Sequence, residues 1–121
     1  MRLIRAVIAF LALLLAAPAF ADPVTAPPSQ NFSGTITTGG TFQQVVPSAY
    51  NTRKGCLVMN PPSATENLYV FFGPAASATT SNSIVLTPNS WASCAIGPVV
   101  VGDAIQVEAP TTSHAYIAVI Q

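Results

Sequence analysis

The chain has 121 residues, of which 50% are hydrophobic and only 7% are charged, and its formal net charge is zero. A chain of this length folds as one domain with a modest core. Without a cluster of basic residues it lacks the contacts that hold a nucleic-acid backbone. Intrinsic disorder is excluded too, because disordered chains combine low hydrophobicity with high charge.

The first residues, 1–21, have the pattern of a secretory signal peptide. Arg2 and Arg5 precede an apolar run over residues 6–17, and the segment ends in the small-x-small sequence AFA. A basic start, a short apolar run and a small-residue cleavage site define such a signal, whereas a spanning helix needs about 20 apolar residues. We therefore predict an exported protein, cleaved after Ala21 and free of a membrane segment, that is periplasmic, secreted or attached to a surface.

After cleavage the chain would begin with a Pro-rich arm, residues 22–33. Its sequence DPVTAPPSQNFS has no apolar periodicity, which indicates an extended lead-in that is either a passive linker or a reach toward a neighbouring subunit. The mature chain would keep two basic residues, Arg53 and Lys54, against four acidic ones, for a formal charge of 2 − 4 = −2. We place both basic residues at a solvated strand entrance.

Residues 34–121 have the pattern of an all-β domain. Short runs of β-branched and aromatic residues are separated by turn signals about every eight to twelve residues. We expect a hairpin over 34–46, in which Gly39-Gly40 makes a tight turn. The strand CLVMN follows and stops at Pro61-Pro62. The strand LYVFF, residues 68–72, is apolar on both faces and therefore central in its sheet.

The C-terminal part continues the same rhythm. The run IVL, residues 84–86, predicts a short strand, and TPNS after it predicts a type I turn. In AIQVEA, residues 104–109, Ile105 and Val107 are expected to point inward, with Gln106 and Glu108 outward. With a last strand in HAYIAVIQ, we predict a single β-sandwich, jelly-roll-like or immunoglobulin-like, with seven or eight short strands.

Two cysteines, Cys56 and Cys94, are an even number in a chain predicted to be exported. We predict a disulfide between them, worth on the order of 4 kcal/mol by the chain-entropy estimate. The alternative is a pair of unpaired buried thiols. With one distant His and no C-x-x-C spacing, they do not form a structural zinc set.

The chain shows no pattern of a catalytic site. His114 follows Ser113, but no G-x-S-x-G elbow is present, and an imidazole at a strand start is more often solvated or hydrogen-bonded. The acidic residues Glu66, Asp103 and Glu108 are explained by surface solubility. No loop supplies the oxygens that calcium needs or the glycines and lysine of a phosphate loop. We expect no enzyme activity, no metal and no cofactor.

The aromatic residues Tyr50 and Trp91 are candidates for a ligand-facing surface that stacks on sugars. The simpler interpretation places both in the core or at its rim. Trp91 stands three residues before Cys94 and would then pack on the disulfide.

Five segments carry a loose pattern, which in chain order includes a basic residue, an apolar strand ending in Asn, a strand ending in Phe-Gly, small residues, a strand and a Pro turn. They are residues 34–46, 53–61, 68–77, 83–91 and 102–109. In these segments the chain resembles a family of small all-β virion proteins of tailed bacteriophages and prophages, of the decoration or fibre kind. The resemblance implies a self-assembling structural protein, and it adds a virion to the possible locations.

We therefore expect a non-enzymatic protein that assembles on a particle or cell surface, with itself or other structural proteins as partners. Low charge supports this expectation, because a weakly charged sheet has little to blunt its edges against pairing. The alternative is a secreted carbohydrate-binding module in which Tyr50 and Trp91 contact a glycan.

Overall fold

The computed structural model describes residues 28–50, 52–96 and 99–121. The predicted signal peptide and most of the predicted arm therefore lie outside the described residues. The fold is all-β, as predicted, with short 3₁₀ turns η1 (Ser48–Tyr50), η2 (Ala75–Ser77) and η3 (Thr80–Asn82). Seven strands have three residues or more: β3 (Gln43–Val46), β4 (Cys56–Met59), β5 (Leu68–Phe72), β6 (Ile84–Leu86), β7 (Trp91–Ser93), β10 (Ile105–Glu108) and β11 (Ala115–Ile120). Four two-residue strands complete the set: β1 (Gln30–Asn31), β2 (Gly34–Thr35), β8 (Ala95–Ile96) and β9 (Val99–Val100).

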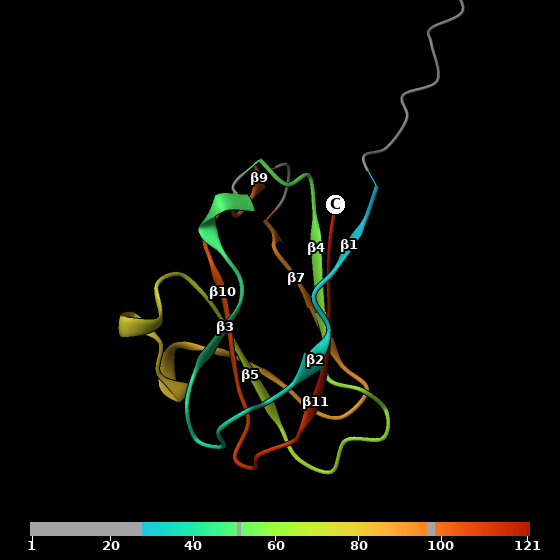
Figure 1. Ribbon diagram of the computed structural model, residues 1–121, viewed down its shortest axis with the longest axis vertical. Coiled ribbons are helices and arrows are strands. Elements are labelled where there is room, and N and C mark those ends of the chain that lie inside the picture. The colour runs from blue at the N-terminus through green and yellow to red at the C-terminus, as the bar shows by residue number, and fades with distance from the viewer. Residues whose placement is uncertain (1–27, 51, 97–98) are drawn as a thin grey trace, which may run out of the picture.

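The strands form two packed sheets and a small ribbon. The five-stranded sheet has the order β1-β11-β4-β7, with β2 also pairing with β11, and the four-stranded sheet has the order β3-β10-β5-β6. Strands β8 and β9 pair only with each other. In Figure 1 the two sheets form two layers, with β3, β10 and β5 on the left and β4, β1 and β11 on the right. The predicted β-sandwich is confirmed, and β5 is central in its sheet as predicted.

The core lies between the two sheets and follows the period of two that strands impose. Along β11 the inward residues Tyr116, Ala118 and Ile120 are buried, and their neighbours are not. The four-stranded sheet supplies the facing layer, since Ile105 and Val107 are fully buried as predicted. The remaining core side chains are mostly aliphatic: Ile36, Val46, Val58, Leu68, Val70, Leu86, Ala92 and Ala109, with the two cysteines.

The predicted hairpin over residues 34–46 is wrong. Strand β2 pairs with β11, where Thr35 lies opposite Ala115, whereas β3 pairs with β10 in the other sheet. The chain crosses between the sheets after the buried Ile36. Gly39 serves close packing here, because an added Cβ would meet the backbone of Pro110 and Thr111. Only Gly40 has the positive φ that was expected of both glycines.

The TPNS turn also moves the chain from one sheet to the other. Ser90 N–H donates to the Thr87 carbonyl at 3.0 Å, as in a β-turn. Asn89, at the third position, has φ 66°. A positive φ at that position belongs to a type II turn, so the type I prediction is wrong. The turn joins β6 of the four-stranded sheet to β7 of the five-stranded sheet.

The end of the predicted arm joins the domain. In β1, Gln30 and Asn31 lie opposite Ile120 and Val119 of β11. Phe32 N–H then donates to the Ala118 carbonyl at 2.7 Å, and the Phe32 ring packs against the core. The final residues of the predicted 22–33 arm thus extend the five-stranded sheet.

Candidate functional site

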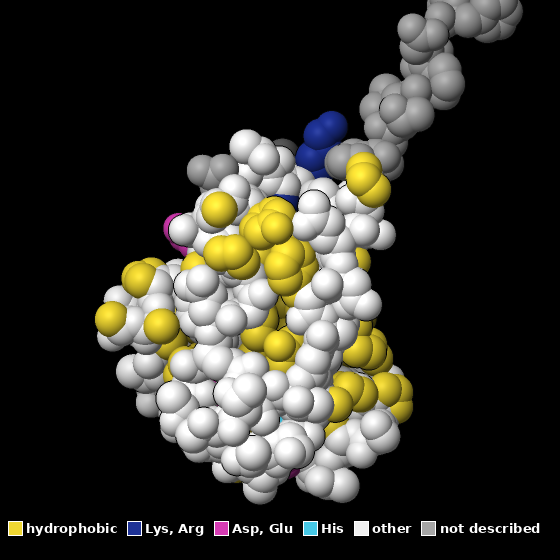
Figure 2. All heavy atoms as spheres, viewed as in Figure 1, with side chains coloured by type: hydrophobic (Ala, Val, Ile, Leu, Met, Phe, Trp, Pro, Cys, Tyr) yellow, Lys and Arg dark blue, Asp and Glu magenta, His cyan; other side chains and the backbone are white. Residues whose placement is uncertain are grey.

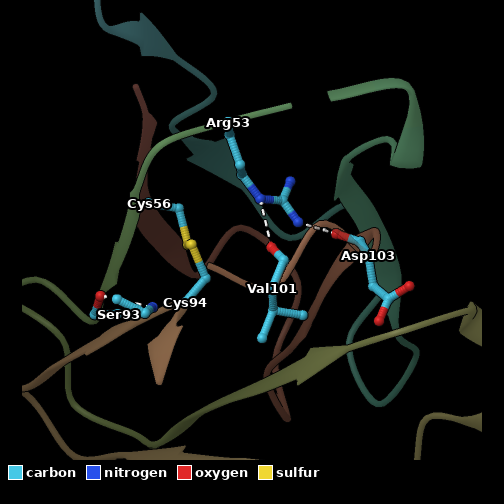
Figure 3. Close-up of a disulfide and its surroundings, with 7 residues drawn as sticks. Arg53, Cys56, Ser93, Cys94, Val101 and Asp103 are labelled. Carbon is cyan, nitrogen blue, oxygen red and sulfur yellow. Dashed lines mark hydrogen bonds between the residues drawn. A yellow bond between two sulfur atoms is a disulfide. The ribbon is translucent and has the colours of Figure 1, made fainter. Parts of the chain in front are cut away.

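The predicted disulfide is confirmed, and it lies within one sheet. Cys56 begins β4 and Cys94 directly follows β7, with their Cα atoms 5.4 Å apart (Figure 3). The pairing extends the register in which Leu57 lies opposite Ser93. A disulfide is typical of an oxidising environment outside the cytoplasm. It joins neighbouring strands rather than the two sheets.

Arg53, next to the disulfide in Figure 3, is buried, so its predicted place in solvent is wrong. Its Nε donates to the Val101 carbonyl at 2.9 Å, and its Nη2 donates to the Asp103 carbonyl. Burial lowers the pKa of the guanidinium, and the nearby charge of Asp103 acts in the opposite direction. Arg53 therefore holds the segment between β9 and β10. Lys54 is exposed, as predicted.

The outward side of the five-stranded sheet has an apolar centre, with polar Ser93 opposite Leu57 and Asn31 opposite Val119. Trp91 lies opposite Met59, which in turn lies opposite Ile117 on β11. One pleat further along, Leu57 lies opposite Val119. Because directly opposed residues share a face of the sheet, these side chains form one continuous surface. We call it the outer apolar face: Leu57, Met59, Trp91, Ile117 and Val119.

Trp91 is 61% exposed, so it does not lie in the core, and its place on a ligand-facing surface stays a prediction. Ala92 takes the inward position of β7 instead. Since successive side chains of a strand point to opposite faces, Trp91 points away from the disulfide and does not pack on it. It is the most exposed residue of the outer apolar face.

Tyr50 lies elsewhere. Its ring meets Phe32 edge to face, with centroids 5.2 Å apart. The Tyr50 carbonyl accepts a hydrogen bond from Arg53 N–H just before β4 begins, whereas Trp91 lies opposite the last residue of β4. In Figure 2 hydrophobic side chains gather in the upper middle of the view, near η1 and β1, the part of the fold to which Phe32 and Tyr50 belong. Tyr50 and Trp91 therefore do not share one stacking surface.

The outward side of β10 in the four-stranded sheet differs, because its polar side chains are covered. Gln106 and Glu108 occupy outward positions, as predicted, but they are 0% and 5% exposed. Gln106 Nε2 donates to the Gly73 carbonyl at 3.1 Å. Burial raises the pKa of the Glu108 carboxyl, and the charge of Glu66 raises it further. Glu108 is thus not a residue for surface solubility.

A polar cluster lies where β4 and β11 meet their loops. His114 Nδ1 is 3.1 Å from Glu66 Oε1, and His114 Nε2 is 3.0 Å from Asn60 Oδ1. Thr111 donates to the same Glu66 oxygen from its backbone N–H at 3.2 Å and from its hydroxyl. The pKa of Glu66 is lowered, mainly by the Thr111 hydroxyl and further by His114. Glu66 therefore carries its charge at neutral pH.

Asn60 completes this cluster. Its side chain is fully buried, and its Nδ2 donates to the carbonyls of Glu66 and Leu86 at 2.9 Å each. Because Nδ2 is the donor, Oδ1 must accept from His114 Nε2. The Nε2 atom of His114 therefore carries a proton in this contact, and Nδ1 faces the carboxylate, to which it donates only when it is protonated as well. Both ring nitrogens face side chains of this cluster, so the imidazole is oriented between Asn60 and Glu66.

The cluster borders an open hollow of about 310 Å³ between the loop after β4 and the turn before β11. Within residues 28–50, 52–96 and 99–121, no three His, Cys, Asp or Glu side chains come together as metal ligands would. In the same ranges no helix has the length and apolarity to cross a membrane. Comparison of the chain with protein-family models, with curated proteins and with solved structures finds no match.

Sequence reasoning did not single out Asn60 or the outer apolar face. Asn60 was only the last letter of an expected strand, and its partners lie 6, 26 and 54 positions away in the chain. The alternation of β11 did carry a signal, since Ile117 and Val119 occupy positions where a solvated sheet normally has polar residues.

Proposed function

We propose that the protein is an exported, non-enzymatic interaction protein that assembles on a particle or cell surface. The observation that carries the proposal is the outer apolar face, with Trp91 at 61% exposure. Soluble monomers rarely expose a continuous apolar patch without a use for it. The disulfide and the signal-like N-terminus support export, and the resemblance to phage virion proteins supports assembly.

A second copy of the same chain is the occupant that best fits this face. No Lys, Arg, Asp or Glu belongs to the outward rows of β4, β7 and β11, so two copies meet without like-charge repulsion. A symmetric dimer places the same patch on both partners, which suits an uncharged and self-complementary surface. A stable interface of this kind buries on the order of 800 Å² on each partner.

Sedimentation velocity of the purified, oxidised protein over a range of concentrations tests the proposal. We expect dimers or larger species, and we expect Leu57→Lys or Ile117→Lys to shift the protein to the monomer. Both side chains point outward, so the melting temperature should change little. Val85→Lys, at an exposed position on the other sheet, is the matched control and should leave assembly intact.

A wild-type protein that stays monomeric at its highest soluble concentration contradicts the proposal. So does a Leu57→Lys variant that assembles like wild type. The alternative function, carbohydrate binding by Tyr50 and Trp91 together, has less support because these two residues lie at opposite ends of β4. A glycan site that uses Trp91 with a different set of residues is developed below.

A further inference from the structure

The hollow beside the polar cluster is lined by five hydroxyl side chains, one carboxylate, one imidazole and the small apolar residues Pro61, Ala64 and Ala115. It lies between the loop after β4 and the turn before β11 and measures about 310 Å³. Its polar lining consists of Ser63, Thr65, Glu66, Thr111, Thr112 and Ser113, with His114 at its base. No Lys, Arg or aromatic side chain belongs to this lining. A ligand held here must present hydrogen-bond donors and carry no negative charge.

Glu66 is positioned so that one carboxylate oxygen is left for a ligand. Among the described residues, Thr111 donates both of its hydrogen bonds to Oε1, and His114 Nδ1 also lies 3.1 Å from Oε1. The side chain remains 20% exposed. Because the pKa of Glu66 is lowered, the free Oε2 is a charged acceptor at neutral pH. A hydroxyl that donates to a charged oxygen forms one of the stronger hydrogen bonds in proteins.

The carboxylate is also held rigidly. His114 fixes it from one side, and Asn60 fixes His114 through Oδ1 while anchoring the Glu66 backbone through Nδ2. Both supporting side chains are buried. A site whose groups are already ordered loses less entropy when a ligand binds. This network therefore holds the Glu66 carboxylate in place as a pre-formed hydrogen-bond acceptor at the surface.

The hollow borders the outer apolar face near Trp91. Two residues of its lining lie close to this face along the sequence, since Pro61 is two positions after Met59 and Ala115 is two positions before Ile117. Two residues of a strand span about 7 Å. Met59 lies directly opposite Trp91. The exposed indole of Trp91 thus lies one strand across and about two residues along from the hollow, which contains the charged acceptor Glu66.

We propose that the hollow and Trp91 together bind a neutral glycan. Sugar hydroxyls supply the donors that Glu66 Oε2 and the Ser and Thr side chains need, and the apolar face of a sugar ring covers the indole. Glu66 and the nearby Glu108 repel acidic glycans. The inference does not depend on self-assembly, although both would use Trp91.

The single tryptophan makes the test direct, because tryptophan fluorescence, excited selectively over that of the three tyrosines, reports on Trp91 alone. The probes are the neutral tetrasaccharides of cellulose, chitin, starch and yeast mannan, titrated into the oxidised protein. A sulfated heparin tetrasaccharide is the control ligand. We expect a saturable change with at least one neutral probe and none with the sulfated one. Glu66→Gln should weaken binding about tenfold or more, because the acceptor loses its charge.

Two further variants keep the result interpretable. Thr65→Arg places a long side chain at an exposed rim position of the hollow, so it should abolish binding even if Glu66→Gln unfolds. Leu57→Lys should remove assembly and leave glycan binding at least as strong as in wild type. Leu57 is four residues from Pro61 along the chain, about 13 Å in an extended strand.

The glycan proposal is overturned if no neutral probe changes the fluorescence of wild type and of Leu57→Lys at millimolar concentration. It is also overturned if Glu66→Gln and Thr65→Arg bind like wild type, or if the sulfated probe binds equally well. A monomeric wild type that binds a neutral probe removes the assembly proposal alone. If wild type assembles but its Leu57→Lys variant binds none of the neutral probes, the glycan proposal alone is overturned.

Discussion

Asn60→Ala is the substitution for which the structure predicts the largest local loss. The Asn60 side chain makes three hydrogen bonds, to the carbonyls of Glu66 and Leu86 and to His114. Truncation leaves two carbonyls and an imidazole N–H without partners in a buried place. Each unsatisfied group costs about 1–3 kcal/mol, and partial relaxation reduces the sum, so we expect a loss of about 3–5 kcal/mol. That is a large share of the roughly 5–15 kcal/mol that stabilises a typical domain.

Urea unfolding measures this loss as a shift of the midpoint at constant slope. The matched control is Asn82→Ala, because the Asn82 side chain also donates to a carbonyl and accepts a hydrogen bond, but it is exposed in η3. Water replaces those partners, so the control should lose about 1 kcal/mol or less. The reasoning is refuted if the two variants lose similar amounts, or if Asn60→Ala loses less than about 1 kcal/mol.

Three further predictions concern the disulfide, the buried arginine and the two acidic residues near the cluster. Replacing Cys56 and Cys94 together by Ser should lower the free energy of unfolding by about 4 kcal/mol, measured in urea, since the bridge spans 38 positions; an unchanged midpoint would contradict this. Arg53→Ala should lower the free energy of unfolding by about 2–4 kcal/mol, because it leaves the Val101 and Asp103 carbonyls unpaired. Lys54→Ala, a substitution of the exposed neighbouring residue, should change the urea midpoint little. The lowered pKa of Glu66 gives stability that is present above its unfolded-state pKa and is lost as pH falls through the lower folded-state value. The raised pKa of Glu108 acts oppositely, because stability is lost as pH rises from the unfolded value through the folded one. In melting curves between pH 3 and pH 8, the melting temperature of Glu66→Gln should therefore decrease relative to wild type as pH rises, and that of Glu108→Gln should increase relative to wild type. Equal changes in both variants would contradict the assignment.

The strands were predictable because period-two alternation is a local signal. It located β4, β5, β10 and β11 and gave the inward side of β10 correctly. Strand pairing is non-local, so no pattern within residues 34–46 indicates that β2 and β3 belong to different sheets. The orientation of Trp91 failed for the same reason, since β7 has three residues and its inward side is set by the register with β4.

The buried polar residues were unpredictable for a different reason. Charge and composition place Arg53 and Glu108 at the surface, and only the tertiary fold supplies the carbonyls that pair Arg53 or the layer that covers Glu108. The cysteines were the exception among long-range pairs. Export and an even count restrict two cysteines to one pairing, so Cys56–Cys94 followed from the sequence without knowledge of the fold.

The outward positions of β10 and β11 differ in character, and this asymmetry bears on function. Antiparallel sheets with one solvated side normally carry polar residues there. On the four-stranded sheet the outward Gln106 and Glu108 are polar, yet the protein covers them itself. On the five-stranded sheet the outward Ile117 and Val119 are apolar, and the described residues leave Trp91 and Leu57 beside them exposed. Solubility alone favours the reverse arrangement, and this is the reason why we propose that a second copy of the chain covers the five-stranded sheet. A charge at Leu57 should therefore disturb association far more than one at Val85, although Val85 is the more exposed of the two.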